Sequence, residues 1–178
     1  MPQFFAFLRA VNAGPPRVTR MSVLRQTFES LGFYGVTTFL ASGNVVFETR
    51  AKDVGHLEKR IERGLSQALG YSVPVFIRTR AELRKIAASE PFDTPAIVDP
   101  DVNIILLAHY LDKKARAKLM ALATETDAFR VHGREIYWWR RKRPSTALFS
   151  AVPLVKALRV PFTIRSISTI KKLTAKWP

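Results

Sequence analysis

The fold of this 178-residue chain is decided by two stretches, Leu8-Arg9-Ala10-Val11-Asn12-Ala13-Gly14 and Leu40-Ala41-Ser42-Gly43-Asn44-Val45-Val46-Phe47. The first continues an almost wholly apolar run that begins at Gln3, which is typical of a buried central strand. The second holds two β-rich runs, 36–40 and 45–47, around a turn in which Gly43 and Asn44 can adopt positive φ. Together they predict a central strand and a hairpin.

Two amphipathic helices are predicted between and after these stretches, because apolar residues recur at spacings of three and four. The first helix ends at Gly32, and the second follows the capping residue Asp53 and ends at Gly70. Their apolar stripes are Met21, Leu24, Phe28 and Leu31, and then Val54, Leu57, Ile61, Leu65 and Ala68. With a strand at 73–78, residues 1–79 have the order β-α-β-β-α-β, which predicts a ferredoxin-like domain.

The rest of the chain repeats this order after a linking helix at 80–88 and a proline-rich loop that ends at 100. Strands are expected at 102–108, 129–131, 135–139 and 160–164, and helices at 112–123, 146–158 and 166–176. Pro153 either kinks the second of these helices or marks its start. We therefore expect an α+β protein of two ferredoxin-like (βαββαβ) halves, with antiparallel sheets and helices on one face. The domains are 1–79 and 101–178, joined by 80–100.

The topology of such a domain brings the two opening stretches to one end of one sheet. Its first two strands run parallel because a right-handed crossover joins them, and the third strand lies between them in the opposite direction. The guanidinium, amide, hydroxyl and backbone N–H donors gathered there are suited to an oxyanion or phosphate, and a helix N-terminus adds a favourable dipole. The predicted ligand-binding residues are Arg9, Asn12, Gly14, Arg20, Ser42, Gly43 and Asn44.

Other interpretations of these residues are purely structural. Ser-Gly-Asn is a good hairpin turn, Asn12 can cap a loop, and Arg9 can form an ion pair. Catalysis is not indicated by any recognisable triad or metal site, because Ser42 has no evident base to activate it. Ala13-Gly14-Pro15-Pro16 also matches no glycine-rich nucleotide-binding motif, and no cofactor is predicted. Whether the protein is an enzyme is left open.

Charge offers a second candidate function. The formal net charge is +15, and residues 130–178 hold twelve Lys or Arg against a single acid, Glu135. The strip Tyr137-Trp138-Trp139-Arg140-Arg141-Lys142-Arg143 combines aromatic and basic side chains, as sites for single-stranded nucleic acid do. The predicted contacts are Trp138, Arg140, Arg141, Lys142, Arg143 and Arg165. Successive strand residues point to opposite faces, so one tryptophan is expected in the core. A solvated basic face or contact with a membrane surface are the alternatives.

Composition excludes or disfavours several other classes of protein. With no cysteine, disulfides and thiolate sites are excluded, and the three histidines lack metal-ligand spacing. Apolar residues at 47% and charged residues at 24% are typical of a folded globular protein. No run is long enough for a membrane span, and a cytoplasmic location is the expectation. A third possibility is an interaction protein that dimerises through its sheet edges.

These same residues carry a resemblance to a bacterial family, the domain-of-unknown-function family 1697. The chain is similar to it in residues 8–14, where the family has Leu-Arg-Gly-Ile-Asn-Val-Gly, in Met21 with Leu24, and in residues 42–47. Fainter similarities are Arg78-Thr79 with Glu82-Leu83, Pro91-Phe92, and Thr163-Ile164-Arg165 with Thr169. Departures are Ala10 for a glycine, Pro15 after Gly14, Ser145-Thr146 for a Ser-Lys pair, and Ser166-Ile167 for Asn-Trp. The resemblance implies a single-chain α/β protein and supplies no reaction, substrate or cofactor.

Overall fold

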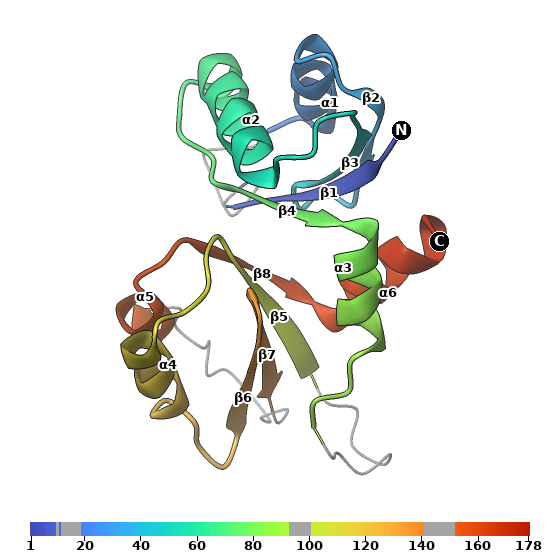
Figure 1. Cartoon of the computed structure of the whole chain (residues 1–178). Helices are drawn as coiled ribbons and strands as arrows, with labels where there is room; N and C mark the ends of the chain where they lie inside the picture. The colour runs from blue at the N-terminus through green and yellow to red at the C-terminus, as the bar shows by residue number, and fades with distance from the viewer. Residues whose placement is uncertain (10, 12–18, 93–100, 141–151) are drawn as a thin grey trace. The chain divides into compact units, whose positions relative to one another are not determined.

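The structure of the chain is a computed structural model, and it describes residues 1–9, 11, 19–92, 101–140 and 152–178. The chain divides into two compact units (Figure 1). One comprises Met1–Lys85 with Trp177–Pro178, and the other comprises Ile86–Lys176. The division falls inside helix α3 (Arg80–Ala88).

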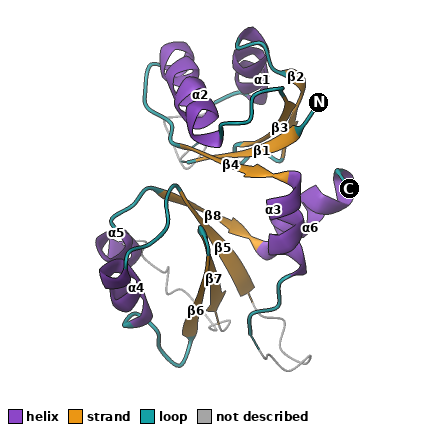
Figure 2. Ribbon diagram, in the orientation of Figure 1, coloured by secondary structure: helices purple, strands orange, loops and turns teal. Residues whose placement is uncertain are grey.

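The first unit holds one four-stranded sheet and two helices that cover one of its faces (Figure 2). The strand order is β2-β3-β1-β4, and every neighbouring pair is antiparallel. Strand β3 therefore separates β1 from β2, as the crossover argument requires. The elements are β1 (Gln3–Leu8), α1 (Met21–Ser30), β2 (Tyr34–Phe39), β3 (Asn44–Glu48), α2 (Val54–Leu69) and β4 (Val75–Thr79).

The core of this unit forms because alternate strand residues meet the apolar stripes of the helices. From β1, Phe4, Ala6 and Leu8 belong to this cluster. The helices contribute Leu24 and Phe28 from α1, and Leu57, Ile61 and Leu65 from α2. Burying each such large side chain contributes about 1.5–3 kcal/mol, so packing rather than helix propensity holds α1 and α2 in place.

The predicted ends of the second helix are confirmed. The Asp53 carboxylate accepts a hydrogen bond from the His56 N–H at 3.0 Å, which satisfies one of the unpaired donors of the first turn. Gly70 closes α2 in the left-handed region with a φ of 76°. Trp177 packs edge-on against Phe5 and Phe39 in the same unit, with ring centroids 6.5 and 5.8 Å away.

The second unit repeats the same element order and the same sheet. Its strand order is β6-β7-β5-β8, again antiparallel throughout. The core includes Ile105, Phe129, Trp138 and Leu158. The elements are β5 (Asp101–Leu107), α4 (Lys113–Met120), β6 (Asp127–His132), β7 (Glu135–Arg140), α5 (Val152–Leu158), β8 (Phe162–Ser166) and α6 (Ile167–Lys176).

The repetition extends to individual hydrogen bonds. In the first unit the Leu8 N–H donates to the Gly43 carbonyl at 2.8 Å, and in the second the Leu107 N–H donates to the Arg134 carbonyl at 2.9 Å. Likewise Arg9 N–H donates to Pro74 at 3.0 Å, and Ala108 N–H to Pro161 at 3.1 Å. The expected α+β fold of two ferredoxin-like halves is confirmed.

Two local predictions need correction. Positive φ occurs at Leu40 and Gly43 of the first hairpin, whereas Asn44 is the first residue of β3 and lies in extended backbone. The last strand runs over Phe162–Ser166 instead of 160–164, because Arg159 takes a left-handed φ of 55° and Pro161 has no N–H for a ladder bond. Pro153 lies in the first turn of the described part of α5, and the predicted residues 146–151 lie outside the described residues.

Candidate functional site

The end of β1 and the β2–β3 turn come into direct contact in the first unit. Besides the bond from Leu8 to Gly43, the turn packs so closely that a Cβ on Gly43 would lie 3.1 Å from the Cβ atoms of both Leu8 and Val11. Gly43 also has a φ of 70°, which other residues adopt only at a cost. Glycine is therefore required where the two opening stretches meet.

The start of α1 is fixed to the same end of the unit. The hydroxyls of Thr19 and Tyr71 form a hydrogen bond of 2.8 Å, which ties the residues before α1 to the connection between α2 and β4. The bond from Arg9 to Pro74 ties the end of β1 to that connection as well. We refer to Arg9, Thr19, Arg20 and the turn 40–43 as the α1 end.

The N-terminus of α1 is unusual in the residue that begins it. Arg20 stands at the N-cap position, is exposed, and makes no capping hydrogen bond through its side chain. The first turn of α1 also contains no acidic residue. A helix N-terminus carries unpaired N–H groups and a partial positive charge, so an arginine there adds to that charge instead of offsetting it.

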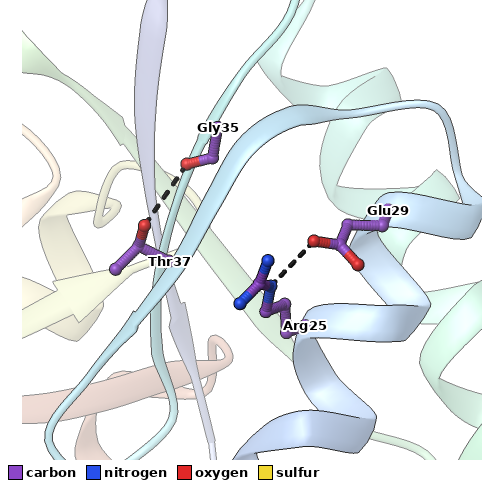
Figure 3. Close-up of polar contacts among 4 residues, drawn as sticks. All are labelled: Arg25, Glu29, Gly35 and Thr37. Carbon is purple, nitrogen blue, oxygen red and sulfur yellow. Dashed lines mark hydrogen bonds and ion pairs between the residues drawn. The ribbon is translucent and has the colours of Figure 1, made fainter.

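The stretch of sequence that leads into α1 is rich in arginine and contains no acidic residue. Three arginines, Arg9, Arg17 and Arg20, occur between residues 9 and 20, where the sequence has no acid. The first acid of the chain is Glu29, and it pairs with Arg25 one turn away on α1 at 2.8 Å (Figure 3). That ion pair is exposed and of little value for stability, but it occupies the carboxylate.

The two polar residues of the hairpin differ in their roles. Asn44 is only 1% exposed, and its Nδ2 donates to the Phe39 carbonyl and the Ser42 Oγ, both at 2.9 Å. An amide nitrogen has two hydrogens, and both are used within the turn. Asn44 therefore holds the hairpin, whereas Ser42 is exposed beside it. Asn12 and Gly14, the other predicted residues of this site, lie outside the described residues.

Burial removes Trp138 from the predicted nucleic-acid strip. The side chain is 3% exposed, its ring stacks on Phe129 with centroids 6.0 Å apart, and its Nε1 donates to Asp127 Oδ1 at 3.0 Å. The guanidinium of Arg140 lies 4.8 Å from the Trp138 ring centroid, in a cation–π contact within the unit. A tryptophan in the core does not stack on a base. Arg141, Lys142 and Arg143 lie outside the described residues.

Arg165 lies partly buried on β8. Its Nη1 donates to Thr163 Oγ1 at 2.9 Å and to the Ile164 carbonyl at 2.8 Å. Burial lowers the pKa of its guanidinium to about 10, which still leaves the group charged at neutral pH. Both of these hydrogen bonds of Arg165 therefore go to residues of its own strand.

Sequence reasoning missed a set of glutamates beside strand β4. Glu62 Oε1 accepts from the Val75 N–H at 2.9 Å, Glu58 Oε1 from the Ile77 N–H at 2.8 Å, and Glu82 Oε2 from the Thr79 N–H at 2.8 Å. Their signal was available, because Glu58 and Glu62 are four residues apart and so share one helix face.

The described residues contain neither a metal-binding cluster nor a membrane-spanning helix. No group of three or more His, Cys, Asp or Glu side chains that could hold a metal ion occurs in 1–9, 11, 19–92, 101–140 or 152–178. Over the same ranges, every helix is too short or too polar to traverse a bilayer.

The fold defines a two-unit α+β protein with a ferredoxin-like sheet in each unit. A family model described as "Protein of unknown function (DUF1697)" matches residues 1–137, so the chain belongs to that family. The resemblance seen in residues 8–14 and 42–47 is thereby confirmed. None of the curated proteins matches the chain.

A solved structure shares the whole architecture. The conserved bacterial protein SP0830 from Streptococcus pneumoniae is similar over 99% of this chain and 99% of its own, with a TM-score of 0.75 and 18% sequence identity. At that identity the similarity shows the fold alone.

Proposed function

We propose that this protein binds a small anionic or phosphate-bearing ligand at the α1 end. The observation that carries the proposal is the arginine at the N-cap of α1, in a first turn without acids. Backbone N–H groups of a helix start bind oxyanions readily, and the dipole adds about 0.3–1 kcal/mol for a nearby negative charge. Arg9 and Arg20 supply the charge that such a ligand requires.

The hairpin would supply the second wall of this site. Ser42 offers an exposed hydroxyl, and Asn44 fixes the turn that presents it. Because Gly43 packs directly on Leu8 and Val11, the hairpin lies at the point where the chain leaves β1. Asn12 and Gly14, predicted from the sequence, fall between β1 and α1 in the sequence and lie outside the described residues. Binding needs no nucleophile or base, and we assign none.

Isothermal titration with inorganic phosphate and pyrophosphate tests the proposal. We expect Arg20→Ala and Arg9→Ala each to weaken binding about fivefold to tenfold, which corresponds to about 1–1.4 kcal/mol. Arg25→Ala is the matched control, because it removes the same charge from α1 at a residue already paired with Glu29. Its affinity should stay within twofold of the wild type. Equal losses in all three variants would indicate only a general charge effect, and no binding by the wild type would refute the proposal.

The alternative function, binding of single-stranded nucleic acid, has less support from the structure than from the sequence. It loses its aromatic contact, because Trp138 is a core residue. What supports it is the charge of residues 136–178, which contain ten Lys or Arg and no Asp or Glu. Charge alone does not distinguish nucleic acid from other anionic partners.

A further inference from the structure

The outer strand β4 of the first sheet has no N–H left to offer a partner. Along an antiparallel outer strand every second residue directs its N–H away from the sheet, and here those residues are Val75, Ile77 and Thr79. Glu62, Glu58 and Glu82 accept all three of these N–H groups, at 2.8–2.9 Å. The outward carbonyl of Ile77 accepts from Arg78 Nη1 at 2.8 Å. Such capping prevents another strand from pairing with β4.

The other outer strand of this sheet, β2, is interrupted instead of capped. Its register with β3 shifts between Tyr34 and Thr37, where Gly35 has a φ of 57°. The Thr37 hydroxyl reaches back to the Gly35 carbonyl at 3.5 Å (Figure 3). An irregularity of this kind is a common way to disfavour pairing along an outer strand.

Strand β8 occupies the position of β4 in the second sheet, with the same hydrogen-bond pattern. The bond from Ala108 to Pro161 corresponds to that from Arg9 to Pro74, so the N–H groups of Ile164 and Ser166 are directed outward. The carbonyl protection is retained, because Arg165 Nη1 donates to Ile164 as Arg78 does to Ile77.

The glutamates are not retained. The sequence contains no Asp or Glu after Glu135, so neither α5 nor α6 can place a carboxylate on β8. In the described ranges, no side chain accepts from the Ile164 N–H. Residue Thr169 stands where Glu82 stands in the first unit. Its N–H donates to Ser166 Oγ at 3.2 Å, and its hydroxyl lies 2.9 Å from the same oxygen, so both contacts go to a side chain and not to a strand N–H.

Charge decides what kind of strand could pair with β8. Arg159 precedes it, Arg165 lies on it, and Lys171 and Lys172 follow on α6, within 43 residues that hold ten cations and no acid. Two copies of β8 would therefore bring like charges together, which disfavours self-pairing. We propose that the outer edge of β8 docks an extended, acidic segment of a partner protein, which adds a strand to the second sheet.

The test uses the full chain and two synthetic peptides, one of alternating glutamate and valine and one of alternating lysine and valine. The ¹⁵N-labelled protein is titrated with each and followed by amide chemical shifts. The glutamate peptide should shift the Ile164 and Ser166 amides and leave Val75 and Ile77 unchanged. The lysine peptide should bind at least tenfold more weakly. Shifts confined to residues outside β8, or equal binding of both peptides, would overturn the proposal.

Ile164→Pro supplies the second arm, because proline removes the outward N–H and is compatible with an outer strand. Binding of the glutamate peptide should fall at least tenfold, while circular dichroism shows the fold retained. If this variant does not fold, the wild-type shift map at Ile164 decides alone. A single-stranded oligothymidine is titrated in parallel. If it shifts the β8 amides and the glutamate peptide does not, the basic region binds nucleic acid and the proposal is wrong.

Discussion

The two units build the same strand ends with the same hydrogen bonds, yet they begin their first helices with opposite charges. In the first unit the N-cap of α1 is Arg20, whose side chain makes no capping bond. In the second unit the N-cap of α4 is Asp112, whose carboxylate accepts from the Ala115 N–H at 2.7 Å. The α4 start has a carboxylate cap, whereas the α1 start carries a cation and no side-chain cap, which is the basis of the anion site proposed there.

The hairpins differ in the same direction. Asn44 begins β3 and pairs with Phe7, and Glu135 begins β7 and pairs with Leu106, so the two residues occupy equivalent places. The first unit has a neutral amide where the second has an acid. The outer strands show the reverse distribution, because glutamates cap β4 and none reaches β8. One fold, repeated, therefore carries different charges at equivalent positions of its two halves.

The largest effect is expected at Gly43. Gly43→Ala forces a Cβ to within 3.1 Å of two side chains at a φ of 70°, and should lower the free energy of unfolding by about 2–4 kcal/mol. Gly133→Ala is the control, because its φ of 64° is similar but its nearest neighbouring atom is 3.5 Å away. It should cost only about 1–2 kcal/mol. Urea unfolding measures both free energies. Equal decreases in the two variants would show that the close contact of Gly43 with Leu8 and Val11 does not contribute to stability.

A smaller effect is expected at the capped outer strand. Glu58→Ala removes the acceptor of the Ile77 N–H and should cost about 1–2 kcal/mol. Hydrogen exchange of the Ile77 amide should accelerate at least tenfold, toward the rate at Ile164, whose N–H is accepted by no carboxylate among the described residues. Glu29→Ala is a suitable control, since that carboxylate pairs with the exposed Arg25 on the same helix. Unchanged exchange at Ile77 would remove the contrast between β4 and β8.

The smallest effects have opposite signs in the two units. Arg20→Asp gives α1 the cap it lacks and should raise the free energy of unfolding by about 0.5–1 kcal/mol. The same change should abolish phosphate binding. Asp112→Ala removes the cap of α4 and should cost about 1 kcal/mol without affecting phosphate. Thermal melts with and without phosphate measure both quantities. If Arg20→Asp instead lowers the free energy of unfolding, the Arg20 side chain stabilises the first unit, which contradicts the view that α1 lacks a cap.

The sequence predicted the elements well because burial sets their periodicity. Residues such as Leu24, Phe28, Leu57 and Ile61 alternate at helical spacing, and each proved to be in the core. Asp53 and Gly70 were predictable for a similar reason, since capping is a local interaction. The strand order of a ferredoxin-like domain was then enough to predict that the end of β1 lies beside the hairpin, as the bond from Leu8 to Gly43 shows.

The roles of individual polar residues were harder to predict. Asn44 looked like a ligand donor, but its side chain is buried and its amide donates to Phe39 and Ser42 within the hairpin. Strand alternation put one tryptophan in the core without saying which, and the bond to Asp127 shows that it is Trp138. The spacing of Glu58 and Glu62 on α2 shows that they share one helix face, but the strand N–H groups that they accept from lie 13 and 19 residues away, and no local pattern identifies those partners.

The central claim is that an anion binds the first unit and not its counterpart. The most direct measurement is a titration of the ¹⁵N-labelled wild type with inorganic phosphate, read at the backbone amides of both first helices. We expect saturable shifts at Met21, Ser22 and Ser42, with Lys113, Lys114 and Gly133 unchanged. Equal shifts in the two units, or shifts confined to residues 152–178, would contradict it.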